Sequence, residues 1–334
     1  MSPSAFRRRA RSAHLPQVSP SAFRAIAIVS VACYALLVVT GGAVRLTGSG
    51  LGCLDWPTCS HASVTPTISF HPLVEFSNRM VSVAVTVVSI VAFLAALRRA
   101  PRRSDLVKLA SGLVVGLLAQ IVLGGIVVLT KLNPYFVAVH FVLTLAVLAD
   151  AVVLLHRATH ADTPAEPAVG SDLVWLARIL LGTVTLLVCV GTIVTGAGPH
   201  AGGPGAKRVP IAFQEIAEFH SDIALFLIGA TLATLFALHH AKAPAAIQRR
   251  ARTVLEVLAL QGALGYTQYF LHDNAFVVEL HLAGATSVWC AMLAFYLGLH
   301  RHPAAVVPAQ AVAAATDQAP VAAPAHPGVA NAPA

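Results

Sequence analysis

Eight apolar segments, each long enough to cross a bilayer, constrain this chain more than any other feature. A helix needs about 20 mostly apolar residues to span the hydrocarbon core, and hydrophobic residues make up 57% of the chain against 11% charged residues. Because lipid offers the peptide groups no water to bond with, such segments must be helical. The sequence therefore predicts an all-α membrane protein with eight transmembrane helices, near 24–45, 72–97, 106–130, 134–155, 173–196, 211–238, 253–271 and 275–299.

The basic residues predict the orientation, because cytoplasmic loops of membrane proteins carry an excess of Lys and Arg. With the N-terminus in the cytoplasm, 17 of the 22 basic residues lie on the inner side and four on the outer side. We therefore expect a multi-pass protein of the cell (plasma) membrane with both termini cytoplasmic. The net charge of +8 reflects this topology and contact with membrane lipid. No nucleic-acid motif is present, so no nucleic-acid partner is expected.

The two halves of the membrane region resemble each other. Residues 120–140 align with 261–281 without a gap, and a Gln, an Asn and a His are among the six identities. At almost the same offset Asn78 matches His220, and TGSG at 47–50 is repeated as TGAG at 195–198. These polar matches predict two tandem four-helix bundles that run in the same direction, a parallel repeat.

The predicted organisation has five parts. Two of these parts are four-helix bundles, and each bundle is expected to hold one functional site. A basic cytoplasmic tail, a cytoplasmic linker and an Ala/Pro-rich disordered tail complete the chain. In order, the tail covers 1–23, the N-terminal bundle 24–156, the linker 157–172, the C-terminal bundle 173–300 and the disordered tail 301–334.

Three histidines fall inside predicted spans, namely His140, His220 and His281. Each lies six to nine residues from the outer end of its helix, which is roughly 10–14 Å into the membrane. Histidine is the usual axial ligand of haem iron, and facing helices of a bundle are where such sites form. His220 and His281 could bind one haem from both faces. The alternative is that each ring bonds a backbone carbonyl or a neighbouring helix. The other histidines are expected to be solvated or exposed.

The first half lacks a second histidine, because Asn78 occupies the position that matches His220. A haem there would be held by His140 alone, with an open axial position that can bind oxygen, whereas a six-coordinate haem mostly transfers electrons. Glu75 lies one turn outward of Asn78 on the same helix face and could shuttle protons at that site. The alternative is that Glu75 only pairs with Arg79, and both roles can coexist. Arg79, or Arg45 at the end of the first helix, could hold a haem propionate.

Cys53 and Cys59 lie in the first outer loop, six positions apart. In an oxidising outer compartment a disulfide between them is plausible. It would either staple the loop over the site or act as a redox-active pair. Metal ligation by two thiols alone is the weaker interpretation.

Several of these residues resemble one known family. The segments GGAVRLTGSGLGCLDWPTC at 41–59 and VEFSNR at 74–79, with the histidines of the fourth, sixth and eighth helices, are similar to the haem A synthase family. Its members are membrane enzymes of cytochrome oxidase assembly that finish the haem of the oxidase. The resemblance covers about 24–299.

The resemblance implies a haem-modifying oxidoreductase that oxidises a pyrrole methyl group of haem O to a formyl group through a hydroxymethyl intermediate. It implies a haem b cofactor held by the iron ligands His220 and His281, and a substrate-haem site with His140 as axial ligand and Glu75 as catalytic acid. From the residues themselves we assign Asn78 and Arg79 to the same substrate-haem site. The implied partners are a haem O synthase (farnesyltransferase) upstream and a haem-copper cytochrome oxidase downstream; a homo-oligomer is left open. Two features depart from the family. Many members have a histidine at Asn78, and some carry a cysteine pair in the loop at 199–210, where this chain has none.

Two other functions compete with this interpretation. A di-haem b-type membrane electron carrier would perform no chemistry on the haem, and Asn78 argues against its second bis-histidine site. A transporter built on the parallel repeat is disfavoured because the spans show few Gly or Pro breaks near the midplane.

Overall fold

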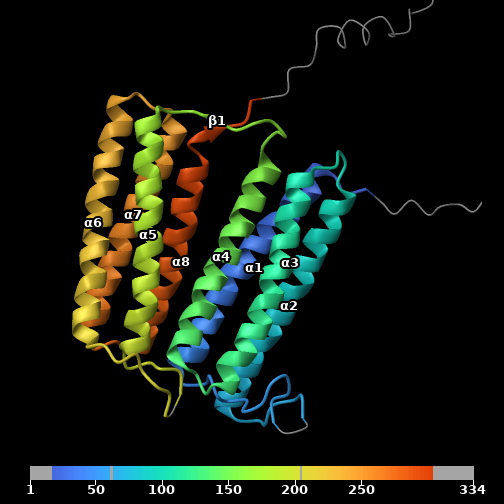
Figure 1. The fold of residues 1–334 in the computed structure, drawn as a ribbon, viewed down its shortest axis with the longest axis vertical. Coiled ribbons are helices and arrows are strands. Elements are labelled where there is room, and N and C mark those ends of the chain that lie inside the picture. Colours follow the sequence, from blue (N-terminus) through green and yellow to red (C-terminus); the bar gives the residue numbers. More distant parts are fainter. Residues whose placement is uncertain (1–16, 61–62, 204, 304–334) are drawn as a thin grey trace, which may run out of the picture.

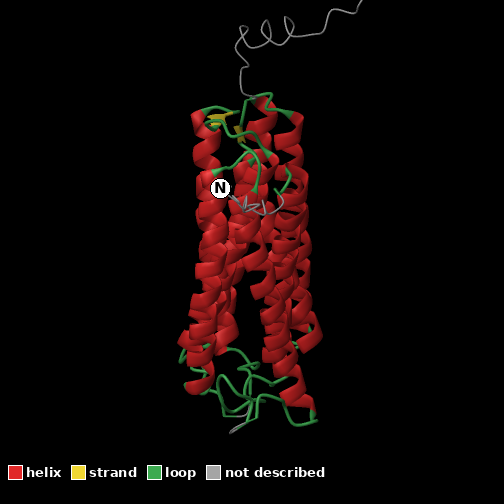
Figure 2. Ribbon diagram, turned by 90° about the vertical axis from the view of Figure 1, so that its right-hand side faces the viewer, coloured by secondary structure: helices red, strands yellow, loops and turns green. Residues whose placement is uncertain are grey.

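The computed structural model describes residues 17–60, 63–203 and 205–303, and in them the chain forms eight long helices and one pair of very short strands. Figure 2 shows the helices running along the long axis with the loops gathered at the two ends. In chain order the elements are α1 Pro20–Leu46, α2 Phe70–Arg98, α3 Ser104–Leu129, α4 Pro134–Thr159, β1 Glu166–Pro167, α5 Ser171–Ala197, α6 Phe213–His240, α7 Ala245–Phe270, α8 Ala275–Leu297 and β2 His300–Arg301.

The helices pack in two groups that follow the sequence (Figure 1). Helix α1 contacts α2 and α4, and α3 contacts α2 and α4. In the second group α5 contacts α6 and α8, and α7 contacts α6 and α8. The groups meet where α1 and α4 lie against α8 and where α4 lies against α5. Apolar side chains fill the interior of both groups, for example Leu113 and Leu148 in the first and Leu227 and Met292 in the second.

Seven of the eight helices are long and apolar enough to cross a membrane, so the chain is a multi-pass, all-helical membrane protein. Helix α7 is not among the seven. Its first half carries Arg249, Arg250, Arg252 and Glu256, and it begins at Ala245 rather than near residue 253 as the sequence suggested. Polar side chains within the predicted span itself, namely Glu256, Gln261 and Gln268, also keep the hydropathy of this helix low.

The turns that precede α4 and α8 have the same construction. Asn133 and Asn274 each cap the following helix by accepting a hydrogen bond from the backbone N–H two residues on, at 3.1 Å and 3.0 Å. In each turn the two residues before the Asn have positive φ, 52° and 60° for Lys131 and Leu132 and 52° and 57° for His272 and Asp273. A side-chain cap of this kind satisfies backbone donors that a helix start leaves free.

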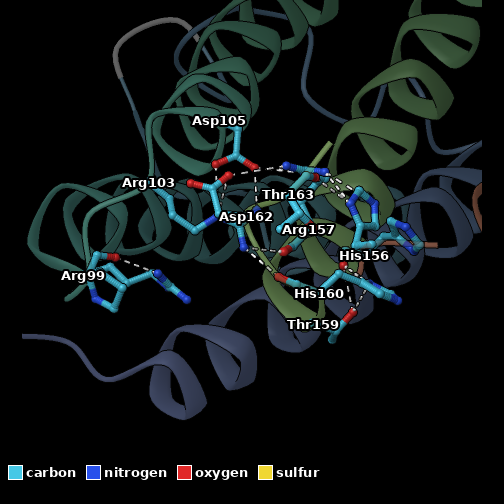
Figure 3. Close-up of polar contacts among 11 residues, drawn as sticks. Arg99, Arg103, Asp105, His156, Arg157, Thr159, His160, Asp162 and Thr163 are labelled. Carbon is cyan, nitrogen blue, oxygen red and sulfur yellow. Dashed lines mark hydrogen bonds and ion pairs between the residues drawn. The ribbon is translucent and has the colours of Figure 1, made fainter. Parts of the chain in front are cut away.

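A polar network ties α3, α4 and the segment after α4 together at the end of the molecule that the sequence places in the cytoplasm (Figure 3). The buried Arg103 pairs with Asp105 at 2.6 Å and donates to the carbonyl oxygens of Arg157 and His160 at 3.0 Å and 2.7 Å. Arg157 also pairs with Asp105, at 2.9 Å. The network therefore fixes the end of α4 against the start of α3.

Three histidines that were predicted to be solvated join this network instead. The rings of His156, His160 and His302 lie with centroids 4.2–5.8 Å apart and are half-buried. The guanidinium of Arg157 donates a hydrogen bond to the imidazole of His302, with Nη1 3.2 Å from Nδ1. They are half-buried because the chain after α8 brings His302 to the end of α4, a contact that periodicity does not reveal.

Two elements extend beyond the predicted limits of the tails. The N-terminal tail was expected to reach residue 23, but α1 begins at Pro20, and Val18 bonds to the end of α2. The C-terminal tail was expected to begin at 301, but Arg301 lies in β2, which pairs with β1. The rest of both tails, 1–16 and 304–334, lies outside the described residues.

Candidate functional site

The rings of His220 on α6 and His281 on α8 face each other inside the second group of helices. Their centroids are 6.5 Å apart, and the ring planes make an angle of 62°. A metal ion between two trans imidazoles, at about 2.0–2.1 Å from each donor nitrogen, requires a centroid separation of about 6 Å. The centroid separation is therefore close to that of two imidazoles on one metal ion.

Each ring has one buried nitrogen without a hydrogen-bond partner, and His220 is also hydrogen-bonded to the backbone of Leu187 on α5. The Nδ1 atoms of His220 and His281 are buried and make no hydrogen bond. Each ring lies against a glycine, because a Cβ on Gly191 would be 3.1 Å from His220 Cε1 and one on Gly265 would be 3.3 Å from His281 Cε1. Buried polar atoms are normally satisfied, so the unpartnered Nδ1 atoms are compatible with a ligand role, whereas the bond of His220 to Leu187 agrees with the alternative that the sequence left open.

His140 on α4 occupies the matching environment in the first group. Its Nδ1 is also buried without a partner, and a Cβ on Gly124 would be 3.4 Å from its Cε1. The amide of Gln120 on α3 donates to the backbone carbonyl of His140 at 3.1 Å, as Gln261 on α7 donates to that of His281 at 2.6 Å. The Gln and Gly identities of the two halves thus surround equivalent histidines.

Asn78 replaces the second histidine in the first group, and its side chain is already engaged. The hydroxyl of Thr40 on α1 donates to Asn78 Oδ1 at 2.8 Å. Across the described ranges no group of three or more His, Cys, Asp or Glu side chains could hold a metal ion. A single or paired histidine suits haem, because the macrocycle supplies the other iron ligands.

Glu75 is buried at the outer end of α2, and its carboxylate joins the helix to the first outer loop. Oε1 pairs with Arg79 at 2.6 Å, and Oε2 accepts the backbone N–H of Cys53 at 2.7 Å. The guanidinium of Arg79 continues into the loop and donates to the carbonyl oxygens of Asp55, Pro57 and Thr58. The ion pair that the sequence left as an alternative is therefore present, and it also anchors the loop.

The loop closes over this end of the first group. Cys53 and Cys59 form a disulfide and are 0% and 3% exposed. Between them, the ring of Trp56 lies on α3, where a Cβ on Gly125 would be 2.8 Å from it. A bridge so deeply buried fits a structural staple better than a pair that exchanges with soluble thiols.

Two intramembrane acids escaped the sequence analysis. Both carboxylate oxygens of Glu279, two residues before His281, are buried without a hydrogen bond. Asp150 lies against α3 where Gly112 leaves room for it. The rule that singled out Glu75, that a charge within a span marks a functional or tightly packed site, would have found both.

Comparison with known proteins identifies the family of this chain. Residues 24–202, more than half of the chain, match the COX15-CtaA family, described as a cytochrome oxidase assembly protein. The chain is 24% identical over 285 residues to a heme A synthase of Staphylococcus haemolyticus, which covers 82% of the chain and 93% of that relative. It is 29% identical over 147 residues to a heme A synthase of Bacillus pumilus, 42% of the chain and 48% of the relative. The matched residues include the outer loop, the Glu75 helix and His140. Because the match covers more than half of the chain, the chain belongs to the COX15-CtaA family of cytochrome oxidase assembly proteins.

Proposed function

We propose that the protein is a haem A synthase, a membrane oxidoreductase that converts haem O to haem A. It oxidises a pyrrole methyl group to a formyl group through a hydroxymethyl intermediate. Family membership and heme A synthase relatives that span nearly the whole chain support this activity. The observation that carries it is the presence of two histidine environments, a facing pair in one helix group and a single buried ring in the other, where Asn78 stands at the position of the second histidine.

The proposed architecture is a tandem repeat of two parallel four-helix bundles, 24–156 and 173–300, that together span the membrane eight times. The equivalent turns, caps, Gln bonds and glycine contacts of the two groups support a duplication. The N-terminal bundle takes the substrate haem and the C-terminal bundle a haem b cofactor. The segment 157–172 is then the cytoplasmic linker.

The residues of the two bundles have different proposed roles. In the first bundle His140 binds the substrate iron, and Asn78, held by Thr40, leaves the opposite face free of a second protein ligand. Glu75 lies one turn outward on the same helix, and its carboxylate holds and transfers the proton. Arg79 holds that carboxylate in place. In the second bundle His220 and His281 hold haem b, which supplies one-electron transfer when bound.

The proposed topology places both termini in the cytoplasm of a cell-membrane protein and the haem sites toward the outer side. The excess of basic residues at one end of the helices supports it. The substrate comes from a farnesyltransferase that makes haem O, and the product goes to a haem-copper oxidase. The substrate and the product are both lipophilic haems that the bilayer retains.

Co-expression tests the activity directly. The chain is produced with a haem O-forming farnesyltransferase in a host that lacks haem A, and the haems of the purified protein are identified by mass. Haem A or its hydroxymethyl precursor together with haem b is the expected result. Haem b alone, with unaltered haem O in the membrane, contradicts the proposal and favours the electron carrier.

A further inference from the structure

A cavity of about 510 Å³ opens between the two helix groups at the end that carries the disulfide loop. The first group contributes Arg45 at the end of α1, the segment that follows it and His71 at the start of α2. The second group contributes residues 199–203, which follow α5. Its volume lies in the range of about 300–1,000 Å³ that small-molecule sites occupy.

Arg45 holds the two sides of this cavity together. Its Nε donates to the carbonyl oxygen of His200 and its Nη2 to that of Thr195, each at 2.7 Å. Beside it, the backbone N–H of Gly50 donates to the carbonyl oxygen of Gly202 at 2.9 Å. These bonds connect the first helix group to the second, so the guanidinium has a fixed place in the cavity wall.

The wall is cationic and has no counter-charge. Among the described residues Arg45 takes part in no ion pair, and the lining contains no Asp or Glu. Three nitrogens of the lining side chains are left without a protein partner in the described chain, namely Arg45 Nη1, His71 Nε2 and His200 Nδ1. A half-buried guanidinium requires an anion or further acceptors, and its planar fork matches a carboxylate.

The cavity lies just outward of the histidine sites. Gly42 on α1 packs directly against Leu282 and Glu279, the residues that flank His281 on α8. Arg45 is three residues further along α1, which is about 5 Å outward. Thr40, which bonds to Asn78 at the first site, is five residues from Arg45, or about 8 Å. A planar ligand centred at the depth of the histidines would present its outer edge to Arg45.

We infer that this cavity binds the carboxylate groups of a tetrapyrrole, with Arg45 as their principal anchor and His71 and His200 as further donors. The inference rests on the proposed function and specifies how the acidic edge of the haem is recognised. Arg79, the other arginine at this end of the first group, donates to Glu75 and to loop carbonyls instead. Because the donors come from both helix groups, a bound carboxylate also links the two halves.

Titration with two forms of one ligand tests the inference. Iron protoporphyrin IX and its dimethyl ester, which has the same ring but no charged carboxylates, are added to the full chain in detergent, and binding is followed in the Soret band. The wild type is expected to bind the free acid about tenfold more tightly than the ester. Arg45→Gln removes most of that preference and leaves the affinity for the ester unchanged. Lys207→Gln removes one exposed positive charge from the same end and changes neither affinity.

The comparison in the wild type needs no variant, so a folding defect of Arg45→Gln does not prevent a decision. Equal affinities for acid and ester overturn the inference while the proposed function stands, because the ring still binds. If 50–100 mM acetate then raises the melting temperature of the wild type but not of Arg45→Gln, the cavity takes a free carboxylate, and the assignment to a tetrapyrrole is wrong. Failure to bind either form overturns the proposed function itself.

Discussion

Glu75 is the residue at which structural and chemical roles meet, since its carboxylate holds the outer loop and lies beside the proposed substrate site. We expect Glu75→Gln to lower haem A formation by about 100-fold or more, the scale of a lost acid–base group. The amide keeps an acceptor oxygen for the Cys53 N–H, so haem b content is expected to stay near the wild-type level. The ratio of haem A to haem O in extracts of co-expressing cells measures the first effect, and the absorption spectrum measures the second.

Glu215→Gln is the matched control for this change. Glu215 is exposed in the first turn of α6, and its replacement by Gln removes the same charge at the same end of the molecule. Haem A formation by this variant is expected to equal that of the wild type. Normal haem A formation by Glu75→Gln would leave the residue as a loop anchor only.

Glycines on α5 test whether His220 is a ligand. A Cβ on Gly191 would be 3.1 Å from His220 Cε1, whereas one on Gly182 would meet nothing within 4 Å. Gly191→Ala is expected to displace the ring by a few tenths of an ångström and to shift the low-spin haem spectrum or the reduction potential. Gly182→Ala on the same helix is expected to keep both and to gain up to about 1 kcal/mol in helix propensity. Identical spectra for the two variants would argue against His220 as an axial ligand.

At the scale of single elements, the caps of α4 and α8 offer a test of the repeat. Because Asn133 and Asn274 make the same hydrogen bond in the same turn, Asn133→Ala and Asn274→Ala are each expected to lower the free energy of unfolding by about 1 kcal/mol. The two sites lie in different helix groups, so their effects should add in the double variant. Asp keeps a capping oxygen, and Asn133→Asp and Asn274→Asp should therefore be nearly neutral. Denaturant titration in detergent measures the free energy of unfolding of all five variants. A loss of stability at only one of the two sites would mean that the turns before α4 and α8 are not equivalent.

The helices show how much of the fold could be predicted from the sequence. Apolar length placed a helix in each of the eight regions, because apolar segments have few alternatives in lipid, and seven of these helices are long and apolar enough to cross a membrane. The start of α7 was missed by eight residues, since a charged amphipathic turn carries no apolar signal. The polar identities of the repeat were recognisable, but their functions were not. The folded structure is needed to see that the Asn is a cap and that the Gln bonds the backbone of the histidine.

Part of the candidate site could likewise be predicted from the sequence, and part could not. Histidines and an acid within apolar spans stand out in the sequence, and the disulfide follows from two cysteines in one short loop. The contacts of Arg45 with Thr195 and His200 span about 150 residues of chain, and no local pattern encodes such a contact. The cavity between the helix groups was therefore not predictable.

For the whole molecule, the decisive contact is the one between α1 and α8. Gly42 lies where a Cβ would be 2.9 Å from Glu279 Oε2 and closer still to Leu282, whereas the neighbouring Gly41 has nothing within 4 Å. We expect Gly42→Val to force the two helix groups apart and to lower the free energy of unfolding by about 1–3 kcal/mol, the usual cost of overpacking. Haem b should be lost with it, because the residues that flank His281 form the other side of this contact. Thermal unfolding and haem content of the purified protein measure the two effects.

Gly41→Val separates this packing effect from the general cost of a β-branched residue in place of glycine. The two substitutions sit one residue apart on one helix and differ only in the face they occupy, so any difference between them reports the contact of α1 with α8. A Gly42→Val protein as stable as Gly41→Val, with full haem content, would mean that the groups do not pack along this line. The cavity at Arg45, one turn further out on the same face, would then lose its second wall, and the carboxylate preference should disappear with it. The stability of the Gly42 variant and the ligand preference at Arg45 thus both test the contact between the two helix groups along α1.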